Sequence, residues 1–139
     1  MVILDSSFLV AYHNTRDVHH EVATGGMERL VAGEWGRALL LEYVFLEVAT
    51  VLLARRGLET ASRVATVLLE AREVDFVPCS ELFVETLEAF RLQSDRGWSF
   101  TDAAIVTVVR RAEGITSVAT FDTGFREIEG LAVVPDSLE

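Results

Sequence analysis

The sequence predicts an α/β fold in three layers, with a central parallel sheet of about five strands between two layers of helices. Five short apolar segments are typical of strands that are buried on both faces of a sheet. The longer segments between them carry apolar residues at helical spacing. Strands that alternate with helices in this way form parallel sheets with right-handed crossovers. Since no linker or repeat divides the chain, we expect one domain over residues 1–139.

The expected strands are runs of aliphatic and β-branched residues that stop at a polar residue, a turn residue or proline. They span residues 2–4, 38–41, 74–77, 117–120 and 131–134. Asp5 directly follows the first strand, and Asp122 comes two residues after the fourth. In parallel sheets, ligands bind at the carboxyl ends of the strands, so both carboxylates are expected at the functional edge.

The expected helices differ in how much of their surface is apolar. Residues 43–56 are almost all apolar and stop at Gly57, which predicts a deeply buried helix. Residues 59–72 show an amphipathic pattern, and 81–93 and 101–113 supply two more helices, the last followed by Gly114. Residues 17–30 form a weaker pattern, because Gly25 and Gly26 are expected to interrupt the helix.

Composition excludes several classes of protein. Charged residues interrupt every apolar run before the roughly 18 residues that a membrane span needs. The chain opens with a strand and has no leader pattern, which predicts a cytoplasmic protein. Its single cysteine, Cys79, forms no internal disulfide and is expected to fill the core. A net charge of −10 disfavours broad adhesion to nucleic acid, although all 12 basic residues are arginines suited to phosphate contacts.

Four carboxylates stand where the chain otherwise places apolar side chains or tight turns: Asp5, Glu47, Asp102 and Asp122. A buried carboxylate costs several kcal/mol unless it is paired or bound to a cation. If the four converge, a divalent cation is the simplest explanation, and oxygen ligands favour Mg²⁺ or Mn²⁺. Such ions also bind phosphate and activate water, so phosphodiester hydrolysis is the natural chemistry.

Each carboxylate also has a structural explanation to be weighed. Asp5 and Asp102 stand where a helix begins, and Asp122 lies in a plausible turn. Glu47 has neither role, because it is the one charged residue between positions 43 and 54. Glu42 is rotated from it by about 140° on a helix and belongs to a first turn instead.

Four segments of the chain resemble the PIN-domain nucleases, especially the VapC-like toxins of toxin–antitoxin pairs. They are ILDSSFLVA, LEVATVLLARRG, SFTDAAIV and VATFDTGF, and the likeness covers nearly the whole chain. The resemblance implies a PIN-like fold and cleavage of RNA by a Mg²⁺- or Mn²⁺-dependent endoribonuclease. It places the catalytic and metal-binding acids at Asp5, Glu47, Asp102 and Asp122, with Ser6 and Thr120 as supporting hydroxyls.

The resemblance also implies partners. A cognate antitoxin protein and a homodimer are expected, with RNA as the substrate. Arg126, four residues after Asp122, is our first candidate for a substrate contact, although a solvated surface role is the common one for arginine. His19 and His20 point about 100° apart on a helix and cannot share a metal from one face.

Other functions remain as alternatives. A noncatalytic protein-binding module of the same fold would use its acids only as helix caps, and a housekeeping PIN nuclease would have no antitoxin. A receiver domain is disfavoured because that family needs a lysine and the chain has none. A dehalogenase-like phosphatase would need DxD after the first strand, where Asp5 is followed by two serines, and no P-loop motif occurs.

Overall fold

A computed structural model of the chain describes residues 1–136, so residues 137–139 of the expected single domain lie outside the described part. It contains a five-stranded sheet in the order β3-β2-β1-β4-β5, with every neighbouring pair parallel. The five expected strands are confirmed with ends shifted by at most one residue: β1 Val2–Leu4, β2 Ala38–Leu41, β3 Val74–Val77, β4 Ser117–Ala119 and β5 Ala132–Val134.

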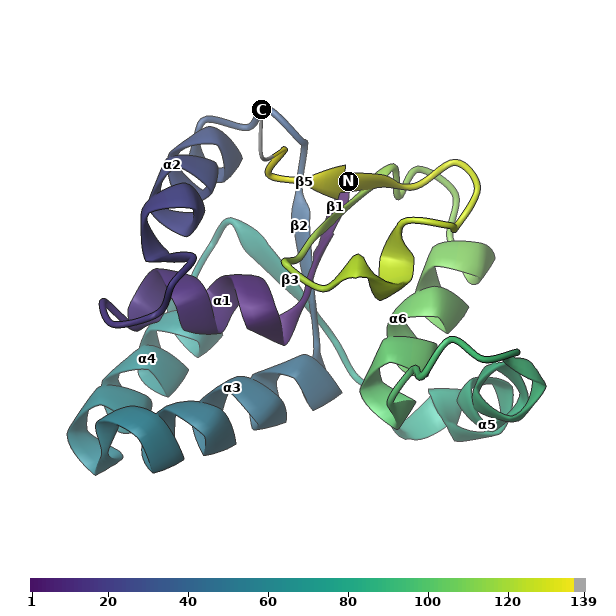
Figure 1. The fold of residues 1–139 in the computed structure, drawn as a ribbon, viewed down its shortest axis with the longest axis horizontal. Helices are drawn as coiled ribbons and strands as arrows, with labels where there is room; N and C mark the ends of the chain where they lie inside the picture. The colour runs from purple at the N-terminus through teal and green to yellow at the C-terminus, as the bar shows by residue number, and fades with distance from the viewer. Residues whose placement is uncertain (137–139) are drawn as a thin grey trace.

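Helices cover both faces of this sheet, which confirms the three-layer α/β/α sandwich (Figure 1). One layer holds α1 Ser6–His13, α2 His20–Val31, α3 Glu42–Arg56 and α4 Leu58–Glu70. The other holds α5 Phe83–Leu92 and α6 Phe100–Arg111, with the short 3₁₀ helices η1 Ser80–Leu82 and η2 Thr123–Phe125 in connecting segments. No helix within residues 1–136 is long and apolar enough to cross a membrane.

The order of the strands places a switch point beside β1. From β1 the chain adds β2 and β3 on one side, and then β4 and β5 on the other. Leu4 and Ala119 are paired at the carboxyl ends of β1 and β4, and the Asp5 N–H donates to the Ala119 carbonyl at 3.0 Å. Asp5 and Thr120 therefore emerge side by side where open parallel sheets bind ligands.

The helix α3 is less buried than its composition suggests. Val44, Val48 and Leu52 form its buried face at a spacing of four residues, whereas Leu46 and Leu53 are about half exposed. The expectation of a deeply buried helix is therefore wrong. Its packing partners α1, α4 and β2 leave the side of α3 that carries Leu46 and Leu53 exposed, and the apolar composition of the segment does not distinguish this side from the buried one.

The helix α2 runs through both glycines, so the expected interruption is also wrong. Gly26 is buried where the chain needs a close approach: a Cβ added there would lie 3.0 Å from a ring carbon of Phe8 and 3.1 Å from the ring of Pro135. Packing against Phe8, which is completely buried, compensates for the low helix propensity of glycine.

The two neighbouring glycines give a matched test of this explanation. Nothing lies within 4 Å of a Cβ added at Gly25, so Gly25→Ala should raise the free energy of unfolding by about 0.5–1 kcal/mol. Gly26→Ala should be less stable than Gly25→Ala by about 1–3 kcal/mol, because the new methyl crowds Phe8 and Pro135. Denaturant unfolding measures both, and equal effects would contradict the close approach.

Candidate active site

The Asp5 carboxylate lies at the carboxyl end of β1 and is only 4 % exposed. It is the one charged side chain among the buried residues that the structure describes. Its Oδ2 accepts hydrogen bonds from the Thr120 hydroxyl at 2.7 Å and the Ser7 hydroxyl at 2.9 Å. Although Asp5 precedes α1, its side chain makes no capping hydrogen bond to that helix. The helix-cap explanation therefore does not account for Asp5.

The two hydroxyls join α1 to the segment that follows β4. Ser7 Oγ lies 3.0 Å from Thr120 Oγ1 and accepts the Phe121 N–H at 2.9 Å. Thr120 Oγ1 accepts the Asp122 N–H, also at 2.9 Å. Each hydroxyl has one proton, and both protons point to Asp5 when its carboxylate is ionised. The network thus fixes the direction of the Asp5 carboxylate and the backbone of Phe121 and Asp122.

Asp102 and Asp122 do have the structural roles that their positions suggest. Asp102 forms a capping box at the start of α6, where its Oδ2 accepts the Ser99 N–H and its own N–H donates to Ser99 Oγ, both at 3.0 Å. Asp122 Oδ1 accepts the Gly124 N–H at 2.9 Å in the turn before η2. Each role uses one oxygen. Asp102 Oδ1 and Asp122 Oδ2 accept no side-chain or cap hydrogen bond within residues 1–136, and the hydroxyls of Ser7 and Thr120 both donate to Asp5 Oδ2 rather than Oδ1.

The pKa values of Asp5 and Asp102 are both raised above the usual value of an aspartate. Burial is the main cause that raises the pKa of Asp5, and the negative charge of Asp122 adds to it, against the lowering effect of the Thr120 and Ser7 hydroxyls. Burial likewise raises the pKa of Asp102, and the charges of Asp5 and Asp122 contribute. The structure therefore brings Asp5, Asp102 and Asp122 within electrostatic range of one another.

Glu47 is partly exposed, so the expectation that its carboxylate is buried in an apolar helix is wrong. It lies on α3, and its Oε1 accepts the Ser6 hydroxyl at 2.9 Å. Ser6 is the residue after Asp5, so this bond holds Glu47 beside the first turn of α1. The competing Glu42 instead accepts the Cys79 N–H at 2.9 Å, as a first-turn residue of α3.

The carboxylates do not form a ready-made metal cage. Within the part of the chain that the structure describes, no three Asp, Glu, His or Cys side chains are close enough to hold one ion between them. Asp5 is nevertheless a buried anion that no described arginine or histidine neutralises by a salt bridge. This all-oxygen donor set fits Mg²⁺, which keeps several waters and needs only one or two direct carboxylates.

Arg126 borders the same region. A hollow of about 240 Å³ is lined by His19, Thr120, Phe121, Asp122 and Arg126, together with Val22, Val133, Pro135 and Asp136. The side chain of Arg126 is exposed, and it makes no salt bridge within residues 1–136. The structure thus places the candidate substrate contact beside Asp122.

Comparison with known proteins identifies the family. The model of the PIN domain matches residues 2–131. The chain belongs to the PIN-domain family. This family consists of nucleases, and its fold matches the sandwich described above, so the resemblance and the PIN-like fold are confirmed. No curated protein sequence was found to match the chain.

Solved structures agree with this assignment. VapC20 of Mycobacterium tuberculosis, described as a toxin that cleaves the sarcin–ricin loop, superposes with a TM-score of 0.78 at 27 % identity. The match covers 91 % of this chain and 93 % of that one. PAE2754 of Pyrobaculum aerophilum superposes with a TM-score of 0.61 at 21 % identity, over 96 % of this chain and 83 % of that one, which supports the fold alone.

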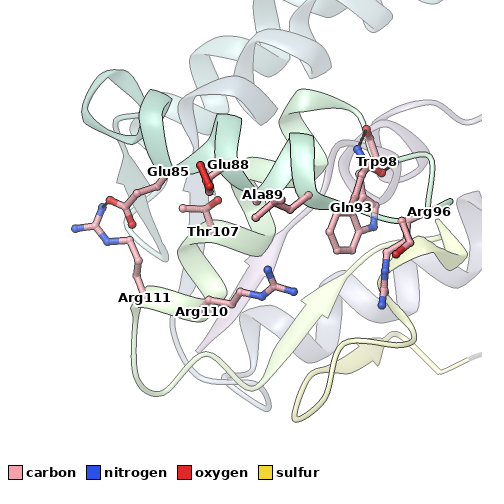
Figure 2. A pocket seen from close by; sticks show the side chains of 11 residues that line it. Glu85, Glu88, Ala89, Gln93, Arg96, Trp98, Thr107, Arg110 and Arg111 are labelled. Carbon is pink, nitrogen blue, oxygen red and sulfur yellow. Dashed lines mark hydrogen bonds and ion pairs between the residues drawn. The ribbon is translucent and has the colours of Figure 1, made fainter.

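A larger hollow of this PIN domain lies elsewhere, between α5 and α6 (Figure 2). It measures about 510 Å³, and Asp102 and Asp122 do not line it. Arg96, whose guanidinium stands 5.0 Å from the Trp98 ring centre, and Arg110 border it. Trp98 is buried, as expected of a core residue, and its indole N–H donates to the Gly124 carbonyl at 3.0 Å. That bond braces the turn that carries Asp122.

Sequence reasoning missed two functional candidates in this PIN domain. The hydroxyl of Ser7, rather than that of Ser6, donates to Asp5. Adjacent serines on a helix differ by about 100° in direction, and nothing in the sequence indicates which hydroxyl faces the carboxylate. His19 stacks on Phe121 with ring centres 4.4 Å apart, a contact between segments that only the fold brings together. His20 binds the Ala11 carbonyl through Nδ1 at 2.8 Å, a structural role.

The Thr120 hydroxyl gives a direct test of the network. Thr120→Val keeps the volume but removes a donor from Asp5 and an acceptor from the Asp122 N–H, so the free energy of unfolding at pH 7 should fall by about 1–3 kcal/mol. Thr120→Ser keeps the hydroxyl and loses one buried methyl, which costs about 0.8 kcal/mol. Denaturant unfolding compares them, and a valine variant as stable as the serine variant would contradict the network.

Proposed function

We propose that this protein is a Mg²⁺- or Mn²⁺-dependent endoribonuclease, the toxin of a toxin–antitoxin pair, that cleaves RNA phosphodiester bonds. The observation that carries the proposal is the buried Asp5 carboxylate, which has no cationic partner among the described residues and lies beside Asp102 and Asp122 at the switch point of a PIN domain. The likeness to VapC20, a toxin that cleaves the sarcin–ricin loop, supports the substrate class.

Asp5, Asp102, Asp122 and Glu47 would hold the metal, partly through water, since Mg²⁺ typically binds one or two carboxylates directly. Their oxygen atoms that accept no protein hydrogen bond are the available ligands. When bound, the ion supplies an activated water and a positive charge at the phosphate. We propose these four acids as the catalytic and metal-binding residues.

The protein's own contribution is orientation. Ser7 and Thr120 fix the Asp5 carboxylate, and Ser6 holds Glu47 in the same way from the neighbouring position on α1. We propose Ser6 and Thr120 as supporting hydroxyls, with Ser7 added by its geometry. Arg126 contacts a phosphate of the substrate from the hollow beside Asp122.

A cognate antitoxin and a second copy of the chain are the proposed protein partners, in the cytoplasm. Exposed apolar side chains on α3, Leu46 and Leu53, support a protein-covered surface, because that face of a helix is otherwise left in water. The alternative is a noncatalytic binding module of the same fold, which the capping role of Asp102 and the turn role of Asp122 support. A housekeeping nuclease would differ only in lacking an antitoxin.

Replacing single acids separates the nuclease from the binding module. Asp5→Asn and Asp102→Asn should each reduce Mg²⁺-dependent cleavage of a single-stranded RNA by at least about a hundredfold, because substitutions of groups that merely support metal ligands already cost 10- to 100-fold. Cleavage is followed by denaturing gel electrophoresis of end-labelled RNA. Both variants should remain folded, as judged by thermal unfolding.

Asp75→Asn is the matched control, since Asp75 is an exposed aspartate on the edge strand β3 paired with Arg37. It removes the same charge from a distant part of the chain and should leave cleavage unchanged. Undiminished cleavage by the purified Asp5 or Asp102 variant would contradict the proposal, and absence of cleavage by the unmodified protein would favour the binding module.

Because the pKa of Asp5 is raised, replacing Asp5 by an uncharged residue should stabilise the metal-free protein to a degree that depends on pH. In metal-free protein the folded state binds the Asp5 proton more tightly than the unfolded state, so this residue lowers the free energy of unfolding as pH rises above about 4. Asp5→Asn should therefore gain stability relative to the unmodified chain as pH rises to 7, by about 1.4 kcal/mol per unit of pKa shift.

Saturating Mg²⁺ should reverse this order at pH 7. A ligand at a hundred times its Kd stabilises the folded chain by about 2.7 kcal/mol, and Asp5→Asn should lose most of that gain. Thermal unfolding with EDTA and with Mg²⁺ measures both effects. An Asp5→Asn variant that is less stable than the unmodified chain in EDTA at every pH would contradict the prediction that the ionised Asp5 carboxylate destabilises the metal-free fold.

A further inference from the structure

We infer that His19 and Phe121 form a stacking platform for one nucleobase of the RNA substrate, next to the phosphate that is cleaved. The inference rests on the proposed nuclease function and deepens it, because it names the part of the substrate that the chain recognises. The observation behind it is a stack of three rings that begins in the core and ends at the surface beside Asp122.

The stack is ordered from the inside outward. Phe8 is completely buried, and its ring lies 6.2 Å from that of Phe121 with an interplanar angle of 30°. The Phe121 ring is partly buried, and the exposed His19 imidazole lies parallel to it, with centres 4.4 Å apart and planes within 5°. Phe121 covers one face of the His19 imidazole. Because His19 is exposed, its other face forms the outer end of the stack. A flat aromatic surface of this kind is what a nucleobase stacks on.

The platform borders the hollow that also contains the polar groups a nucleotide needs. His19, Phe121, Asp122 and Arg126 all line the hollow of about 240 Å³. A base against the rings would place its phosphate within the region shared by the guanidinium of Arg126 and the proposed metal ligands. The hollow thus combines an exposed ring face, one arginine and two carboxylates, Asp122 and Asp136. Because the ring face suits a base and the arginine suits a phosphate, this lining matches a nucleotide better than an apolar or a purely anionic ligand.

The platform is fixed relative to the catalytic acids. The Phe121 N–H donates to Ser7 Oγ, and the Asp122 N–H donates to Thr120 Oγ1, both at 2.9 Å. These hydroxyls are the ones that hold the Asp5 carboxylate. The backbone of His19 is also held in place, because its main-chain N–H donates to Asp17 Oδ1 at 2.8 Å. A base on the rings is therefore placed at a constant position with respect to Asp5.

Stacking is compatible with the charge of the chain. With a net charge of −10, summed attraction to phosphates contributes little to RNA binding, whereas stacking does not depend on net charge. Neither ring nitrogen of His19 hydrogen-bonds to another residue within 1–136, so the imidazole is not needed for an internal polar contact. A proton-donor role for His19 and a purely structural one are the competing explanations that the test separates.

Binding is tested first, in the non-cleaving Asp5→Asn background. The probe is a short single-stranded RNA that carries the fluorescent base 2-aminopurine at each position in turn, because stacking on an aromatic ring quenches its emission. We expect quenching at one position. Adding His19→Ala should abolish it and raise the Kd by about 5- to 150-fold. Adding His19→Phe, which keeps the ring and removes the nitrogens, should retain it.

Val18→Ala in the same background is the control, because Val18 is 89 % exposed in the preceding loop and does not line the hollow. It should leave both the quenching and the Kd unchanged. Quenching that survives His19→Ala, or that is lost equally in His19→Phe, overturns the platform. Since this assay needs no cleavage, it decides the inference even if the unmodified protein proves inactive, an outcome that would overturn only the proposed nuclease function.

Cleavage kinetics give the second readout. In the otherwise unmodified protein, His19→Ala should raise KM by about 5- to 150-fold, whereas His19→Phe should restore it. An abasic nucleotide at the quenched position should penalise the unmodified protein and not the His19→Ala variant. A loss of kcat in both His19 variants, with KM unchanged, would assign His19 to proton transfer instead and overturn the stacking role.

Discussion

The Asp5 carboxylate lies at the junction of β1 and β4, where two hydroxyls, and no cationic side chain of the described residues, compensate for its burial. Strand order creates this junction, because the chain extends the sheet to one side of β1 and then to the other. Ser7 enters it from α1 and Thr120 from the end of β4. The same hydroxyls then fix the backbone that carries Phe121 and Asp122, so the orientation of one buried anion sets the geometry of the whole site.

Structural and functional roles coincide in the other aspartates. Asp102 completes a capping box and Asp122 closes a turn, yet each uses only one oxygen for that purpose. A capping role and a metal-binding role are therefore compatible in one aspartate, although the sequence presents them as competing explanations. It supplies the rigidity that a ligand needs, since the backbone bond holds the second oxygen in one direction. The raised pKa values of Asp5 and Asp102 reflect the cost of this arrangement, which comes mainly from burial and to a smaller degree from the neighbouring negative charges.

The sequence predicted the sheet well because buried parallel strands are short, continuous apolar runs that stop at polar residues or proline. It failed where the outcome depends on contacts between distant segments. Gly26 is helical because Phe8 and Pro135 occupy the space of a side chain, and α3 keeps Leu46 and Leu53 exposed because no described element covers them. Glu47 was selected for a burial that it does not have, and its support from the Ser6 hydroxyl follows from the packing of α1 on α3.

The acidic surface of the chain restricts how it can recognise RNA. Binding through phosphate contacts strengthens with the number of basic side chains that face the strand, and among the described residues Arg126 is the one arginine that lines the hollow beside Asp122. In the proposed function, affinity would then come from interactions that a negative field does not weaken, namely a metal ion at the acids and stacking on aromatic rings. A bound ion would offset the repulsion between the carboxylates and the phosphate, whereas stacking does not depend on net charge. A site with both elements would hold a base and its phosphate together. This would give the ring stack beside Asp122 a role in binding RNA in addition to its role in packing.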